Sequence, residues 1–348
     1  MPMPKTPATA VPQPSLFDDA PAPVKPPRHR AVTPSIPDGD LMALAQQLSP
    51  HIHLGTSSWS FPGWQGLVWA DEHSEAQLSR EGLGAYAAHP LLRSVSIDRS
   101  FYRPMTAEQY AVYAAQVPED FRFVVKAPAL VTDSVLRGEG GRGIESNPAF
   151  LDPQRAVAEF VQPALQGLGP KIGALVFELS PLPAARKRDM LALLDRLEQM
   201  LAALPALAPT APDGVIAVEV RDPEWLTPDL RDVLRAHGAR YCLGLHPRLP
   251  PIQEQLPLLR ALWPGPLVCR WSLNRLHGVH GYESAKEGYA PFNRLVDPDP
   301  ETRQTLARVI RATAEAGHPV YVTINNKAEG SAPLSVLELA QDIAGGTA

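Results

Sequence analysis

Cysteine is nearly absent from this chain, with two residues, Cys242 and Cys269, among 348. Neither stands in a Cys-x-x-Cys pair or at a Cys/His metal spacing, so the sequence argues against a disulfide scaffold and a thiolate metal centre. Both fall inside apolar segments that we expect to be strands. We interpret them as small buried residues of a protein from a reducing compartment.

Long apolar runs and an excess of positive charge are also missing. No segment approaches the roughly 20 apolar residues of a membrane-spanning helix, and residues 1–20 lack the apolar centre of a signal peptide. The chain has 32 Lys and Arg against 37 Asp and Glu, a net charge of −5, which argues against broad nonspecific binding to nucleic acid. We expect a soluble cytoplasmic protein with no membrane partner.

Proline, by contrast, is abundant and concentrated at the start of the chain. Residues 1–38 are dense in proline, alanine and small polar residues, a composition typical of a disordered tail. Within it, Gln13 precedes the apolar pair Leu16 and Phe17, which resembles the short peptide by which bacterial proteins dock on the DNA polymerase sliding clamp. The alternative is a chance apolar pair. We assign residues 1–38 to the tail and 39–348 to one folded domain.

The folded part shows an eightfold alternation of short β-branched or apolar runs with longer helical stretches. The runs cover residues 53–59, 94–102, 121–128, 173–181, 214–225, 241–247, 266–272 and 319–327. Eight strands alternating with helices imply parallel pairing, so the sequence predicts an α/β TIM (β/α)8 barrel. Helix ends agree: Thr106 and Thr227 suit N-caps, and Gly238 and Gly317 suit C-caps.

Several motifs in this order resemble the family called domain of unknown function 72, or YecE-like. The matching segments are Gly55-Thr56-Ser57-Ser58-Trp59-Ser60, Phe101-Tyr102-Arg103, Phe123-Val124-Val125-Lys126, Glu219-Val220-Arg221, Arg275-Leu276-His277-Gly278 and Asn325-Asn326. The resemblance spans about residues 52–344 and implies a TIM barrel, but no established reaction. The chain also departs from the family's pattern, because His246 stands where the family usually has Asp and Lys327 follows the two asparagines.

Ionisable residues at the ends of the predicted strands identify the candidate site, since barrel proteins place reactive groups at the carboxyl ends of their strands. Glu178, Glu219 and Asp98 are the candidate general acids and bases, because neighbouring carboxylates can differ in pKa. Strand alternation places Asp98 and Tyr102 on one face of the second run. The candidate ligand-binding residues are Lys126, Arg221, Arg270, Asn325, Asn326, Trp59, Tyr102, Ser57 and His277.

These residues favour an enzyme that acts on an anionic or phosphorylated small molecule by acid/base chemistry. We expect no metal and no cofactor, because the interleaved Lys and Arg would repel a dication; a metal-dependent version would use Asp98, Glu178, Glu219 and His246. Three other interpretations stay open. They are a nucleic-acid-associated protein docked on the sliding clamp, a noncatalytic ligand sensor, and a purely structural layer of ion pairs.

Overall fold

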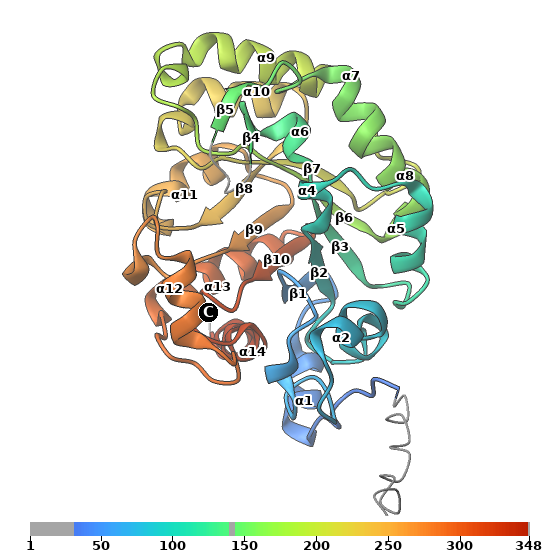
Figure 1. The fold of residues 1–348 in the computed structure, drawn as a ribbon. Coiled ribbons are helices and arrows are strands. Elements are labelled where there is room, and N and C mark those ends of the chain that lie inside the picture. Colours follow the sequence, from blue (N-terminus) through green and yellow to red (C-terminus); the bar gives the residue numbers. More distant parts are fainter. Residues whose placement is uncertain (1–30, 139–142, 347–348) are drawn as a thin grey trace, which may run out of the picture. The chain divides into compact units, whose positions relative to one another are not determined.

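The fold is a closed barrel of eight parallel strands, in a computed structural model that describes residues 31–138 and 143–346 (Figure 1). The strands follow one another around the barrel in the order β1-β10-β9-β8-β7-β6-β3-β2. Their bounds are β1 Ile52–Thr56, β2 Ser94–Ile97, β3 Arg122–Lys126, β6 Ile172–Glu178, β7 Val215–Glu219, β8 Arg240–Leu245, β9 Leu267–Trp271 and β10 Val320–Ile324. Each predicted apolar run overlaps one of these strands, with bounds that differ by one residue at the start of β1, β6 and β8, so the predicted fold class is confirmed.

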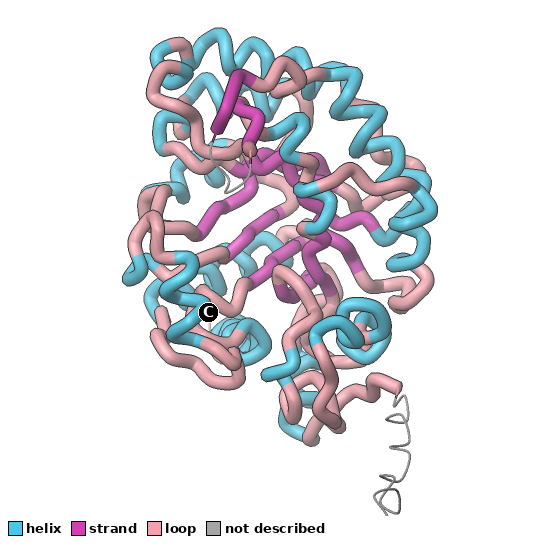
Figure 2. The backbone as a smooth tube through the Cα atoms, viewed as in Figure 1, coloured by secondary structure: helices cyan, strands magenta, loops and turns pink. Residues whose placement is uncertain are grey.

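Helices surround the strands, as Figure 2 shows. The longer ones are α1 Gly39–Gln47, α2 Glu75–Glu81, α3 Leu83–Ala87, α5 Ala107–Ala114, α8 Gln162–Leu168, α9 Met190–Ala203, α10 Pro228–Ala236, α11 Ile252–Ala261, α12 Tyr282–Tyr289, α13 Pro300–Glu315 and α14 Ala332–Ala344. Single helical turns are α4 Arg99–Tyr102, α6 Ala129–Thr132 and α7 Pro153–Ala156, and a π-helical turn, Val157–Val161, joins α7 to α8. Short 3-10 turns are Pro62–Trp64, Gly169–Lys171, Arg186–Arg188, Pro223–Trp225 and Arg275–His277.

The predicted helix ends are found where expected. Thr106 forms a capping box with Gln109, and the Thr227 side chain accepts a hydrogen bond from the Leu230 amide. Gly238 and Gly317 follow α10 and α13 with φ of 63° and 77°, values that glycine adopts without steric cost. Local side-chain chemistry therefore sets these boundaries.

The second strand is shorter than the sequence predicted. It ends at Ile97, and the chain turns at once into α4. The Ser100 hydroxyl donates to the carbonyl oxygens of Ile97 (2.9 Å) and Lys126 (2.6 Å), which ties this turn to the end of β3. Tyr102 consequently does not continue the strand face of Asp98, and it is 85% exposed.

Regular secondary structure forms within two of the long loops that follow strands. The loop after β3 contains an antiparallel hairpin of β4 Val135–Arg137 and β5 Gly143–Ser146, and the loop after β9 contains α12.

Residues just before position 39 belong to the folded unit, because the Ser35 amide donates to the Val68 carbonyl and the Ala70 amide donates to the Thr33 carbonyl. Residues 1–30, including the clamp-like Gln13, Leu16 and Phe17, lie outside the described residues.

The core has two layers. Inside the barrel pack Val124, Ala174, Val176, Ala217, Cys242, Val268 and Tyr321. A larger apolar layer, which includes Cys269, lies between the strands and the helices. Both cysteines are buried and free of disulfides, as their apolar interpretation predicted. The interior is therefore filled with apolar side chains below the carboxyl ends of the strands.

Tight packing between β1 and β2 gives a first prediction. A Cβ atom added at Gly55 would lie 1.8 Å from the Ser94 carbonyl oxygen. At Gly288 in α12, no atom of the described residues lies within 4 Å of the added Cβ, apart from its chain neighbours and the backbone of its own helix. We expect Gly55→Ala to lower the free energy of unfolding by about 3 kcal/mol or more. Gly288→Ala, the matched control, should be neutral or stabilise by about 0.5–1 kcal/mol. Urea unfolding of both variants measures this; equal stabilities would contradict the packing described here.

Candidate functional site

Charged side chains from five strands meet at the carboxyl end of the barrel. Glu178 and Glu219 are the last residues of β6 and β7 and are paired in register. Lys126 is the last residue of β3, Asp98 directly follows β2, and Arg270 lies near the end of β9. The parallel arrangement of the strands is what brings together these residues, which are far apart in sequence.

Arg270 is the centre of this cluster. Its Nη1 lies 2.6 Å from Glu178 Oε2 and 2.7 Å from Glu219 Oε2, and its Nη2 lies 2.9 Å from Asp98 Oδ2. The guanidinium side chain is only 5% exposed. One buried cation therefore contacts all three carboxylates that the sequence nominated as acids and bases.

Two further cations complete the cluster. Arg221 Nη2 lies 2.7 Å from Glu178 Oε2 and 2.8 Å from Glu219 Oε1, and Lys126 Nζ lies 3.0 Å from Glu178 Oε1. Three carboxylates thus face three cations in a network that we call the Arg270 cluster: Asp98, Glu178 and Glu219 with Lys126, Arg221 and Arg270. With all six ionised its formal charge is zero, so the cluster itself has no net attraction for an anion.

The two glutamates of the cluster have pKa values shifted in opposite directions. Burial alone would raise the pKa of Glu178, but Arg221, Lys126 and Arg270 together hold it well below its usual range. At Glu219 burial dominates over the attraction of Arg221 and Arg270, and the pKa is raised. Opposed shifts of this kind are typical of paired acids and bases. Glu219, however, is completely buried.

A cavity of about 300 Å³ opens above the cluster. Its lining residues are Ser57, Asp98, Phe101, Tyr102, Lys126, Glu178, Pro181, Arg221, His246, Arg248, Arg270, Ser272, Tyr282 and Asn325. Glu219 is not among them and lies beneath the cavity. Of the three carboxylates, Asp98 has the most accessible side chain, at 35% exposed, against 10% for Glu178.

His246, one residue after β8, is held as a neutral imidazole. Its Nδ1 accepts a hydrogen bond from the Arg248 amide at 3.1 Å, which leaves the ring proton on Nε2. Burial, followed by the charge of Arg221, lowers the pKa of His246 to about 3. At neutral pH the cavity therefore has a histidine that donates a hydrogen bond without carrying a charge.

The structure brings only some of the predicted ligand-binding residues to the cavity. Ser57, Tyr102 and Asn325 line it together with Lys126, Arg221 and Arg270, whereas Trp59, Asn326 and His277 do not. The Trp59 ring packs edge-on against Tyr113. Asn326 Oδ1 accepts from Trp64 Nε1 and from the Ala332 amide, and His277 Nε2 lies 2.7 Å from the Tyr289 hydroxyl.

Some lining residues were not nominated from the sequence. Tyr282 belongs to α12, inside the long loop after β9, and is 47% exposed. Arg248 lies in the loop after β8 and Ser272 directly follows β9. The unusual length of the loop after β9 was the available signal for Tyr282, because long loops at this end of a barrel commonly contact substrate.

Two further structural observations concern metals and membranes. In residues 31–138 and 143–346, no group of three or more His, Cys, Asp or Glu side chains is arranged to hold a metal ion. The acidic side chains that would serve are already paired with Lys and Arg in the Arg270 cluster. None of the helices in these same ranges is long and apolar enough to cross a membrane.

The fold and the position of the cavity define a TIM-barrel protein with its candidate site at the carboxyl ends of the strands. The model of a protein family, "Protein of unknown function DUF72", matches residues 53–347. The chain belongs to this DUF72 family, as the sequence motifs indicated. No curated protein matches the sequence significantly.

Solved structures of family members share the fold. A DUF72 family protein from Enterococcus faecalis V583 has a TM-score of 0.55 at 19% identity, covering 85% of this chain and 96% of that one. A second structure of this protein gives 0.53 at 20% identity, with coverages of 85% and 98%. A DUF72 family protein from Thermotoga maritima MSB8 gives 0.52 at 19% identity, with coverages of 83% and 98%. At these identities the likeness concerns the fold alone.

The central place of Arg270 gives a second prediction. Arg270→Leu leaves buried carboxylates without their shared cation, and we expect it to lower the free energy of unfolding by about 3–5 kcal/mol. Adding Glu219→Gln should recover part of this loss, because the neutral amide needs no counter-charge. Arg294→Gln, at an exposed position, is the control. Urea unfolding is the measurement, and a loss below about 1 kcal/mol for Arg270→Leu would contradict the role given to Arg270.

Proposed function

We propose that this protein is an enzyme that moves a proton on a small anionic or phosphorylated molecule, an isomerisation in its simplest form. The observation that carries the proposal is the presence, in one cavity, of an accessible carboxylate, Asp98, and a neutral histidine, His246. A carboxylate base combined with a neutral imidazole donor is a recurring arrangement for abstracting a proton next to a carbonyl group.

Asp98 is the best-placed base of the three carboxylates. Its Oδ1 accepts hydrogen bonds from Ser96 Oγ at 2.6 Å and Arg270 Nη2 at 3.1 Å, and its Oδ2 accepts from the same Nη2 at 2.9 Å. These contacts hold the carboxylate in place while more than a third of the side chain stays accessible. Glu178 has a strongly lowered pKa and contacts three cations, so its proposed role is to fix those cations. Glu219 is out of reach of a substrate.

His246 is proposed as the electrophile. When Asp98 removes a proton from the carbon next to a carbonyl group, negative charge develops on the carbonyl oxygen. A hydrogen bond from His246 Nε2 would stabilise that charge. Because the imidazole is neutral, it would not attract a phosphate or carboxylate group of the substrate in place of the carbonyl oxygen. Asn325 and Ser57, at the ends of β10 and β1, supply further polar groups for a hydroxyl or amide of the substrate.

Attraction of an anion must come from cations outside the Arg270 cluster, because the cluster is charge-balanced. Arg248 lines the cavity itself. A groove of about 450 Å³ contains three exposed arginines, Arg80, Arg99 and Arg103, and none of the described residues that line it is acidic. Helix α4 belongs to both sites, since Arg99 lines the groove and Tyr102 lines the cavity. A local positive potential of this kind steers anions despite the net charge of −5.

Exchange of carbon-bound protons tests the proposal without knowledge of the substrate. The full-length protein is incubated in D2O with a panel of phosphorylated and carboxylated hydroxyaldehydes and hydroxyketones, and loss of C–H signals is followed by NMR. We expect at least one compound to exchange. Asp98→Asn should slow this exchange by about 10²–10⁴-fold, and His246→Gln should slow it while binding persists.

Asp40→Asn, at an exposed position in α1, is the matched control and should exchange at the native rate. Thermal unfolding checks that Asp98→Asn is folded, because the substitution also removes a partner of Arg270. An exchange rate unchanged in folded Asp98→Asn would refute the assignment of the base. Hydrolysis of a panel member without exchange would replace isomerisation by hydrolytic chemistry at the same site.

A second proposal concerns the sequence Gln13 to Phe17. As a cytoplasmic protein this chain would meet the sliding clamp, and two large apolar side chains following a glutamine suit a short peptide docked in an apolar pocket. We expect the full-length protein to bind purified sliding clamp with a micromolar Kd by titration calorimetry. Leu16→Ala/Phe17→Ala should lose this binding, whereas Pro21→Ala/Pro23→Ala, outside the peptide, should retain it. Absence of micromolar binding by the native chain would remove the support for this partner.

A further inference from the structure

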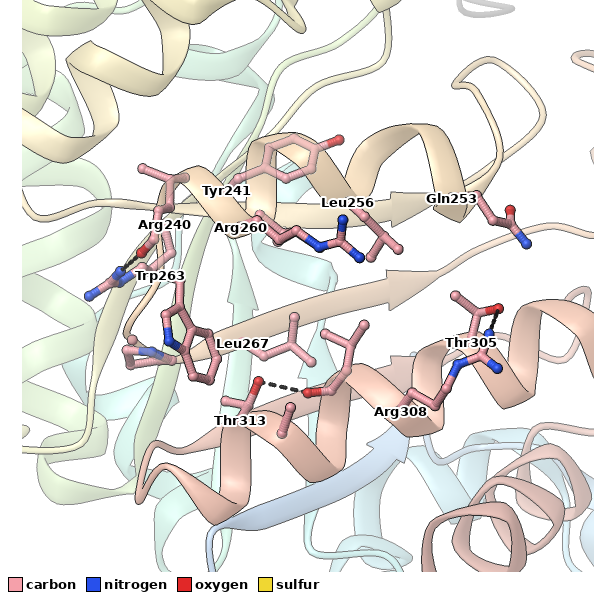
Figure 3. A pocket seen from close by; sticks show the side chains of 16 residues that line it. Arg240, Tyr241, Gln253, Leu256, Arg260, Trp263, Leu267, Thr305, Arg308 and Thr313 are labelled. Atoms are coloured by element: carbon pink, nitrogen blue, oxygen red, sulfur yellow. Dashed lines mark hydrogen bonds between the residues drawn. The ribbon is translucent and has the colours of Figure 1, made fainter. Parts of the chain in front are cut away.

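A second and larger cavity lies on the outer side of the barrel, between α11 and α13 (Figure 3). Its volume is about 700 Å³, within the range of roughly 300–1,000 Å³ typical of small-molecule sites. Tyr241 of β8 and Leu267 of β9 line it. The next residue after each of these, Cys242 and Val268, packs inside the barrel, so this cavity and the site at the strand ends are separate.

The walls of the outer cavity are mainly apolar. Leu256 and Leu259 come from α11, and Val309 and Ala312 come from α13. Pro257 lies within α11, where it lacks the backbone N–H of a regular helix and its ring disfavours a straight one. Trp263, just after α11, lines the cavity and is 47% exposed. Apolar surface exposed in a concave site is typical of ligand binding.

Among the described residues that line the cavity, the charged ones are all positive. They are Arg240, Arg260 and Arg308. Arg240 is occupied, because its Nη1 donates to the carbonyl oxygens of Leu262 and Pro264. Arg308 donates to the Thr305 hydroxyl at 3.0 Å. Within the two described stretches of the chain, neither Arg260 nor Arg308 forms an ion pair with a carboxylate.

Trp263 and Arg308 lie at different ends of the cavity, and Arg240, which lies near Trp263, is already occupied by carbonyl oxygens. In Figure 3 Trp263 lies at one end of the gap between the helices, whereas the guanidinium of Arg308 lies toward the other, beside Thr305. A ligand that satisfies both ends has an apolar body and one negatively charged head. A guanidinium binds a carboxylate head with two parallel hydrogen bonds.

We infer that the outer cavity is a binding site for a small aliphatic carboxylate, a free medium-chain fatty acid in chemical class. Its chain lies among Leu256, Leu259 and Val309, and its carboxylate contacts Arg260 and Arg308. The site is independent of the chemistry proposed at the strand ends.

Titration calorimetry of the full-length protein with sodium octanoate tests this inference. We expect octanoate to bind with a submillimolar Kd. Butyrate, which is four methylenes shorter, should bind about 250-fold more weakly, because each buried methylene contributes about a fourfold factor. Octan-1-ol has the same chain without the charge. It should bind at least about tenfold more weakly than octanoate. Equal affinities for octanoate and octan-1-ol, or no octanoate binding below 10 mM, would overturn the inference.

Matched variants locate the site. Arg260→Gln and Arg308→Gln should each weaken octanoate binding about tenfold and leave octan-1-ol unaffected. Ala312→Phe should abolish binding of both by filling the cavity, whereas Ala111→Phe, at an exposed position of α5, should not. Far-UV circular dichroism checks the fold of each variant. Unchanged octanoate affinity in folded Ala312→Phe would disprove the location, and loss of binding in Arg248→Gln would place octanoate at the strand ends instead.

Discussion

The structure at the carboxyl end of the barrel depends on one desolvated cation. Arg270 is buried at the point where β2, β6 and β7 deliver Asp98, Glu178 and Glu219, and an unpaired ion at this depth would cost several kcal/mol. The carboxylates, in turn, are tolerable there only because Arg270, Arg221 and Lys126 neutralise them. Stability and the layout of the candidate site thus come from the same contacts, and neither can be changed without the other.

Charge balance in this cluster also limits what the site can do. The three cations of the cluster are already paired with carboxylates, so the anion binding that we propose relies on Arg248 and on the arginine groove beside α4. The cluster instead holds its carboxylates still. His246 matters for the same reason: it is a neutral donor and adds no further negative charge to the cavity.

The barrel itself was predictable from the sequence, because strand periodicity and helix caps are local signals. Thr106, Thr227, Gly238 and Gly317 all mark real helix ends. The end of β2 was not predictable, since it depends on the Ser100 hydroxyl reaching the carbonyl of Lys126 in another strand. The same limit applies to the site. The positions of the strand ends identified the charged cluster residues Asp98, Lys126, Glu178, Arg221 and Arg270. Three other predicted residues turn away from the cavity because each contacts a tertiary partner: Trp59 packs on Tyr113, Asn326 bonds to Trp64, and His277 bonds to Tyr289.

The sequence separation within the Arg270 cluster has a consequence for how the chain is made. Asp98 and Arg270 are 172 residues apart, and Glu178 precedes Arg270 by 92. During synthesis from the N-terminus, β2, β6 and β7 emerge well before the cation that three of their carboxylates share. The charge balance at this end of the barrel is therefore complete only after β9 has been synthesised. Arg270 stands at position 270 of 348, so burial of these three acids with their full set of cations requires more than three quarters of the chain.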